Sequence, residues 1–116
     1  MTQGRASKTN LASEYVAYIA DQLSAHREVQ VKRFFGGVAL LANNIQFAII
    51  MKDTLYFCVH PDNRQHYLDR GMGPFTYQTA KGTVSVQRYY EVPADILEDS
   101  EILASWMDIA MVDARQ

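Results

Sequence analysis

The fold is decided by the stretch Phe34-Phe35-Gly36-Gly37-Val38-Ala39-Leu40-Leu41, in which two consecutive glycines separate two apolar runs. Glycine adopts positive φ angles without the steric cost of a Cβ atom. A glycine pair between strand-like segments therefore marks a place where the backbone turns sharply or passes very close to another group. The pair organises the sheet that we predict around it, but it identifies no chemistry.

Around the glycine pair, short apolar runs alternate with turn sequences. Asn43-Asn44 and Lys52-Asp53 each fit a two-residue hairpin turn between such runs. Four short strands linked by tight turns form an antiparallel meander. The predicted strands are 29–35, 38–42, 45–51 and 55–59.

The middle strand of this meander is apolar on both faces. Alternation along 45–51 places Ala48 and Ile50 on one face and Phe47, Ile49 and Met51 on the other. We expect helices to cover one face of such a strand, and the N-terminal helix or a partner subunit to cover the other.

Helical spacing appears first near the N-terminus. Apolar residues recur every fourth position from Leu11 to Leu23, and Asn10 stands at the N-cap position, which predicts a helix ending near His26. Pro61 begins a second, short helix that Gly71 ends.

The C-terminal half adds two strands and a final helical region. The runs 75–78 and 83–90 form a hairpin through Lys81-Gly82, and Pro93 then restarts helix. Asp99 or Ser100 caps the last helix. Its apolar stripe consists of Ile102, Leu103, Trp106, Met107, Ala110 and Met111.

These elements predict an α+β fold in the order α-β-β-β-β-α-β-β-α. We expect a mostly antiparallel sheet of five to six strands with helices packed mainly on one face. The length of 116 residues supports one domain, for which we expect residues 10–116, after a flexible tail at 1–9.

Composition excludes several classes of protein. With 48% hydrophobic and 21% charged residues, the chain has the makeup of a folded domain. Residues 1–90 carry ten Lys and Arg against six Asp and Glu, whereas 91–116 carry one against seven. This mildly basic body is too dilute in charge for a strong DNA-binding surface, which concentrates its basic residues.

Cys58 is the single cysteine, so no intrachain disulfide forms. The N-terminus lacks the apolar core of a signal peptide, and no run is long enough for a membrane span. We expect a cytoplasmic protein without membrane contact.

Several motifs, taken in order, resemble the N-terminal domain of the TfoX/Sxy family over residues 12 to 112. The combination is more specific than any one piece. The motifs are Phe35-Gly36-Gly37, Phe47-Ala48-Ile49-Ile50, Leu55-Tyr56-Phe57-Cys58-Val59, Asp62-Asn63 through Tyr67 to Gly71, Pro74-Phe75-Thr76-Tyr77, Tyr89-Tyr90-Glu91-Val92-Pro93 and Leu97-Glu98-Asp99.

This resemblance implies a bacterial regulatory protein linked to natural competence. Full-length members of the family raise transcription of DNA-uptake genes together with the cAMP receptor protein, and the implied fold is a compact α+β domain. The resemblance assigns the signature positions a role in structural turns. They are Phe35, Gly36, Gly37, Gly71, Pro74, Phe75, Tyr77, Tyr90 and Pro93.

A metal or catalytic site is not what we expect. Cys58, His60, Asp62 and His66 fall within nine residues, but a structural zinc site takes paired Cys or His ligands at short spacings. Cys58 lacks a motif that would activate it as a nucleophile, and the glycines do not form a phosphate-binding loop. The acidic residues Asp95, Glu98, Asp99 and Glu101 are explained by helix N-terminal positions. We therefore predict no catalytic residue, no metal and no cofactor.

Contact with a protein partner is the function that we expect, through transcription machinery or a larger regulator. The alternative is a stand-alone, self-associating adaptor domain, and a homodimer stays open. The Trp106, Met107 and Met111 stripe fits a core better than a partner site. Direct DNA binding is not favoured and would draw on Arg27, Lys32, Arg33, Lys81 and Arg88.

Overall fold

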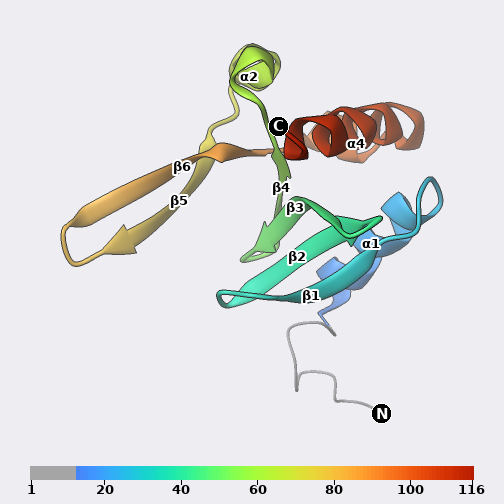
Figure 1. Cartoon of the computed structure of the whole chain (residues 1–116), viewed down its shortest axis with the longest axis horizontal. Coiled ribbons are helices and arrows are strands. Elements are labelled where there is room, and N and C mark those ends of the chain that lie inside the picture. Colours follow the sequence, from blue (N-terminus) through green and yellow to red (C-terminus); the bar gives the residue numbers. More distant parts are fainter. Residues whose placement is uncertain (1–12) are drawn as a thin grey trace.

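A six-stranded antiparallel sheet with helices against it forms the framework of the protein (Figure 1). The computed structural model describes residues 13–116. In chain order the elements are α1 (Glu14–Ser24), β1 (Gln30–Phe34), β2 (Gly37–Ala42), β3 (Ile45–Met51), β4 (Thr54–Cys58), the 3-10 helix η3 (Pro61–Asn63), α2 (Arg64–Leu68), β5 (Pro74–Thr79), β6 (Gly82–Glu91), α3 (Ala94–Leu97) and α4 (Ser100–Ala114).

The strands lie in the order β1-β2-β3-β4-β6-β5, and every neighbouring pair is antiparallel. This arrangement confirms the predicted α+β fold and its mostly antiparallel sheet. The β5–β6 hairpin joins the meander through β6, so β5 becomes an edge strand opposite β1. Figure 1 shows this hairpin projecting well away from the helices.

Tight turns connect the meander as the sequence predicts. Asn43 and Asn44 have φ angles of 54° and 64°, and Lys52 and Asp53 have φ angles of 51° and 57°. Positive φ at both central positions is the geometry of a type I′ turn, whose twist matches that of the flanking strands. The β5–β6 hairpin is also confirmed, with Thr79 paired to Gly82 across the turn.

Each glycine of the central pair has one of the two expected roles. Gly36 (φ 91°) turns the chain together with Phe35 (φ 47°), which lies in the turn and not in a strand. Gly37 begins β2 and passes so close to β3 that an added Cβ would overlap the carbonyl oxygen of Ile50 and lie 2.5 Å from the sulfur of Met51. The sharp turn and the close approach therefore occur at neighbouring residues.

Helices α1 and α4 contribute to one core on a single face of the sheet. Val16, Ile19 and Leu23 of α1 join the core cluster that includes strand residues such as Leu40 and Phe57. From α4 the buried residues are Leu103, Met107, Ala110 and Met111, with Trp106 packed against them.

The core role predicted for Trp106, Met107 and Met111 is thus confirmed, whereas Ile102 of the same apolar stripe lies outside the core. Its side chain is 43% exposed. Because successive helical residues are rotated by about 100°, Ile102 points away from the buried side that Leu103 and Met107 define. Ile102 therefore belongs to the apolar stripe by its spacing but not to the core.

Capping residues set the helix ends. The hydroxyl of Ser13 accepts a hydrogen bond from the Val16 amide at 3.2 Å, so α1 starts after Ser13. The expected cap Asn10 lies outside the described residues. Asp99 caps α4 as predicted, accepting from the amides of Glu101 and Ile102 at 3.2 and 3.1 Å.

A β-bulge changes the face on which Phe47 lies. Leu40 pairs with Ala48 and Leu41 pairs with Gln46, which leaves Phe47 as the additional residue of β3. Phe47 is fully buried in the helix-side core, with its ring centroid 5.9 Å from that of Phe57. The prediction that Phe47 lies opposite Ala48 was therefore wrong, since strict alternation does not hold across a bulge.

Candidate functional site

The sheet face opposite α1 and α4, here called the second face, carries an apolar groove of about 400 Å³. It lies between the end of the β1–β2 hairpin and the β5–β6 hairpin, with β3 beneath. We call it the aromatic groove. It is lined by Phe34, Phe35, Ile49, Met51, Phe75, Tyr77, Val86 and Tyr89.

Two pairs of rings form the walls of the aromatic groove. Phe34 and Phe35 meet edge to face with centroids 4.8 Å apart, and Phe75 stacks on Tyr77 at 6.1 Å. The ring of Tyr56 supports Phe75 from β4, edge to face at 5.3 Å. Such ring pairs pack favourably against each other, so the walls present aromatic surfaces to the groove.

The floor of the groove is apolar and recessed. Ile49 is only 1% exposed, although it faces away from the helix-side core. The prediction that β3 is apolar on both faces is confirmed for Ile49. Within the described chain, the side chains around the groove surround this position, and α1 packs on the other face of the sheet. Cover by a partner subunit stays a prediction.

Tyr89 is the polar group of the floor. Its hydroxyl accepts a hydrogen bond from the side-chain amide of Gln46 at 3.1 Å. Burial raises the pKa of Tyr89, so the phenol is neutral at physiological pH. The eight lining residues include no carboxylate and no basic side chain. The groove is therefore a neutral recess without an acid and base poised for proton transfer.

The signature residues from the sequence divide into groove and framework positions. Phe35, Phe75 and Tyr77 line the groove. Gly36, Gly37 and Gly71 shape turns or close approaches, and Gly71 has a φ of 78° after α2. The remaining three hold β6 and its neighbours: Pro74 pairs with Tyr90, Tyr90 is buried, and Pro93 stands at the N-cap of α3.

The structure does not bring the five predicted basic residues together. Lys32 and Arg33 are successive residues of β1 and point to opposite faces. Lys81 lies in the turn at the tip of the β5–β6 hairpin, far from the loop after α1 that carries Arg27 (Figure 1). Arg88 donates to the backbone carbonyl of Asp113 at 3.1 Å.

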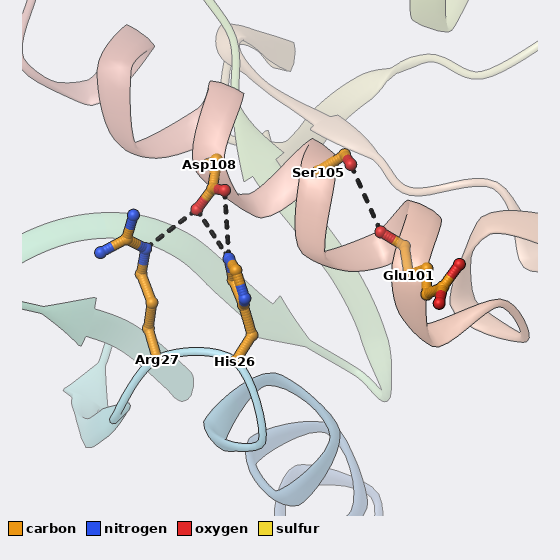
Figure 2. Close-up of polar contacts among 5 residues, drawn as sticks. All are labelled: His26, Arg27, Glu101, Ser105 and Asp108. Atoms are coloured by element: carbon orange, nitrogen blue, oxygen red, sulfur yellow. Dashed lines mark hydrogen bonds and ion pairs between the residues drawn. The ribbon is translucent and has the colours of Figure 1, made fainter.

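Arg27 belongs to a small ion-pair cluster that joins the α1–β1 loop to α4 (Figure 2). The Nε of Arg27 and the Nε2 of His26 both lie 2.9 Å from Oδ1 of Asp108. Burial acts to raise the pKa of Asp108, but the hydrogen bonds from Arg27 and His26 outweigh it, and the pKa is lowered. The cluster is exposed, and the ion pair with Asp108 gives Arg27 a structural role that does not require a nucleic acid.

The outer side of α4 carries an exposed apolar stripe, here called the α4 surface, formed by Ile102, Ile109 and Val112. These side chains are 43%, 48% and 54% exposed, and spacings of seven and three residues place them on one side of the helix. By helical spacing, Glu101 and Asp108 lie along one border of this stripe. Ser105 donates to the Glu101 carbonyl at 3.3 Å (Figure 2).

Cys58 and the nearby imidazoles do not form a ligand set. His60 Nδ1 accepts from the Asp62 amide at 3.1 Å, and His66 is exposed on α2. Burial raises the pKa of Cys58, which keeps the thiol protonated. Within residues 13–116, no group of three or more His, Cys, Asp or Glu side chains is arranged to hold a metal ion.

Asp113 is a residue that sequence reasoning missed. It is 3% exposed, and its Oδ2 accepts from the His60 amide and from Asn63 Nδ2, both at 3.0 Å. The carboxylate thereby joins the end of α4 to the segment that begins η3. A signal was available, because Asp113 follows the buried Ala110 by three positions and so falls on the buried side of the helix.

The acidic residues at helix starts have mixed roles. Asp99 is a cap, as predicted. Asp95 instead forms an ion pair with Arg70 of the segment after α2, with Nη1 and Oδ2 2.7 Å apart. Arg70 also lies over the ring of Trp106, 5.6 Å from its centroid. Both contacts of Arg70 are structural, and they pair Asp95 with a base instead of with a second carboxylate.

The fold and site define an α+β domain with one helix-covered sheet face and an aromatic groove on the other. The family model for the TfoX N-terminal domain matches residues 21–114, and the chain belongs to that family. No curated protein matches the chain. Within residues 13–116, every helix is too short or too polar to cross a membrane.

Proposed function

We propose that this chain is a non-enzymatic regulatory domain that acts in the cytoplasm by contact with a protein of the transcription machinery. Membership of the TfoX N-terminal domain family carries this proposal. The regulated process is the expression of DNA-uptake genes. The neutral lining of the aromatic groove supports a role without catalysis, because it offers no acid and base pair.

The α4 surface is the contact site of this proposal. Ile102, Ile109 and Val112 present apolar area to solvent on a helix that already packs its other side in the core. Of the seven acidic side chains in residues 91–116, Glu101 borders the stripe, whereas Asp113 is buried and Asp95 and Asp108 pair with arginines. Charge complementarity selects a partner surface with an apolar groove and a basic residue opposite Glu101, as in helix-in-groove recognition.

Ile109→Glu tests this contact site. The wild-type domain is expected to retain purified RNA polymerase or the cAMP receptor protein in a pull-down, and Ile109→Glu to lose that retention. Tyr18→Glu is the matched control, because Tyr18 is 50% exposed on α1.

In cells, deletion of the gene is expected to abolish DNA uptake, which wild type and Tyr18→Glu restore. Equal retention by both variants would contradict the proposed surface, and unchanged uptake would contradict the competence role.

Self-association is the second candidate, favoured by exposed aromatic groups on the second face. Phe35 is 86% exposed and Tyr77 is 46% exposed. Sedimentation equilibrium distinguishes the two candidates: a dimer that Tyr77→Glu dissociates and that binds no regulator supports the adaptor function. A salt-sensitive shift of promoter DNA by the purified protein would instead support direct DNA binding.

A further inference from the structure

We propose that the aromatic groove is a binding site for a small, uncharged, planar aromatic molecule. This inference does not depend on the proposed contact of α4 with a partner. The groove volume of about 400 Å³ is in the lower part of the range of roughly 300–1,000 Å³ for small-molecule sites. A site of this size accommodates a small organic molecule.

The shape of the groove selects a flat ligand. Phe34 and Phe35 come from one hairpin and Phe75 and Tyr77 from another, and the two ring pairs lie on either side of the β3 floor. Aromatic groups pair with each other in stacked or edge-to-face arrangements, which a planar ring adopts between two such walls.

The charge of the groove selects a neutral ligand. No lining residue carries a charge at neutral pH, and burial raises the pKa of Tyr89. A charged group entering this recess would lose its hydration without gaining an opposite charge, which is unfavourable. The lining of the groove is therefore electrostatically complementary to an uncharged molecule.

Tyr89 adds one directional contact. Its oxygen accepts from the Gln46 amide, so its hydroxyl hydrogen can be donated to an acceptor atom of a ligand that reaches this end of the groove. A neutral aromatic molecule that carries one acceptor matches both the apolar walls and this hydroxyl.

A second copy of the chain fits the floor less well. Ile49 is 1% exposed at the base of the groove, and Phe35, the most exposed aromatic side chain of this region, stands in the groove wall. The floor is therefore recessed behind the walls. A sheet face laid over the mouth would leave this recess unfilled, and unfilled volume in an interface forfeits packing contacts.

The experiment uses the full chain and the neutral dye N-phenyl-1-naphthylamine, whose emission rises in apolar sites. We expect saturable binding of one dye per chain and about tenfold weaker binding of the anionic dye 8-anilinonaphthalene-1-sulfonate. Val86→Trp, which fills the groove, and Tyr77→Glu, which adds a charge to its wall, are each expected to weaken binding of the neutral dye at least about tenfold.

Three controls keep the test decisive. Tyr18→Glu makes the same chemical change at a similarly exposed tyrosine of α1 and is expected to bind like wild type. Ile109→Glu is also expected to bind the dye normally, even where it loses the protein partner. Circular dichroism and thermal unfolding verify that each groove variant is folded.

The inference is overturned if the dye does not saturate, if the anionic dye binds as tightly, or if folded Val86→Trp and Tyr77→Glu bind like wild type. It is also overturned if sedimentation shows a dimer that both groove variants dissociate, because the occupant is then a second copy. Competition of the dye by an apolar peptide, but by no small aromatic such as naphthalene or indole, would likewise assign the groove to a protein partner.

Discussion

At the scale of single residues, the backbone of the β1–β2 hairpin depends on the absence of a side chain at Gly37. A Cβ there would overlap the Ile50 carbonyl oxygen, a backbone atom that cannot rotate away. We expect Gly37→Ala to lower the free energy of unfolding by about 1–3 kcal/mol, the usual effect of overpacking. Urea denaturation measures the change.

Gly73→Ala is the matched control for this substitution. A Cβ at Gly73 would meet no atom within 4 Å, and its φ is outside the left-handed region. We expect its free energy of unfolding to stay within about 0.5 kcal/mol of wild type. Similar losses in the free energy of unfolding for both variants would show that the close approach to β3 is not what requires a glycine at position 37.

Phe35 carries a conformational strain beside the groove. Its φ of 47° is in the left-handed region, which costs a residue with a bulky side chain about 1 kcal/mol. Asparagine tolerates this conformation, so we expect Phe35→Asn to raise the free energy of unfolding by about 0.5–1 kcal/mol. The same change removes one ring of the groove wall.

Thermal unfolding and dye titration on one sample of Phe35→Asn measure both effects. A more stable variant with weaker dye binding would place Phe35 among residues that trade stability for a binding surface. A less stable variant would mean that the contact with Phe34, at 4.8 Å between centroids, outweighs the strain.

At the scale of secondary-structure elements, Asp113 fixes the end of α4 to the loop after β4. Asp113→Ala would leave the His60 amide and Asn63 Nδ2 without their buried acceptor. We expect a loss of about 2–3 kcal/mol in the free energy of unfolding, because buried polar groups lose their partners. Asp108→Ala, at an exposed carboxylate of the same helix, is expected to lose less than about 1 kcal/mol.

The Asp108 cluster predicts a pH dependence. Its lowered folded-state pKa means that the ionised carboxylate stabilises the fold above its ordinary pKa near 4, and that this contribution is lost as the pH falls through the folded pKa. The side chain is 42% exposed, so the contribution is at most about 1 kcal/mol. Urea unfolding of wild type and Asp108→Asn should therefore differ at pH 6 and converge near pH 2. A difference that grows on acidification would contradict this sign.

Local chemistry made most elements predictable. Asn43-Asn44 and Lys52-Asp53 carry their own turn preference, and Asp99 carries its own capping oxygen. The bulge at Phe47 could not be predicted from β3 alone, because it is a mismatch between two strands. The exposure of Ile102 could not be predicted for a related reason: an apolar residue beside a buried stripe gives no local sign of whether another element covers it.

At the scale of the whole molecule, the aromatic groove was only half predictable. Alternation indicated an apolar second face, and the family resemblance singled out Phe35, Phe75 and Tyr77. Nothing local indicated that they meet. The groove exists because two hairpins separated by some forty residues lie on either side of β3, and this juxtaposition depends on the order of the strands in the sheet, which no single segment specifies.

The same architecture predicts how stability is distributed. The central strand β3 has four consecutive buried residues, whereas β5 and β6 are exposed over most of the hairpin that projects in Figure 1. We expect native-state hydrogen exchange to show β3 amides opening only on global unfolding and amides near Thr79 and Gly82 opening by local fraying.

Hydrogen exchange measured at several protein concentrations distinguishes an uncovered second face from one that is covered by a second copy or by a small ligand. If the hairpin is uncovered, exchange at its tip is fast and independent of concentration. Protection at the tip that rises with concentration would mean that a second copy covers it, because only association depends on concentration in this way. Protection that rises with neutral dye, confined to residues around Phe75 and Val86, would instead mean that a small ligand orders the wall of the groove.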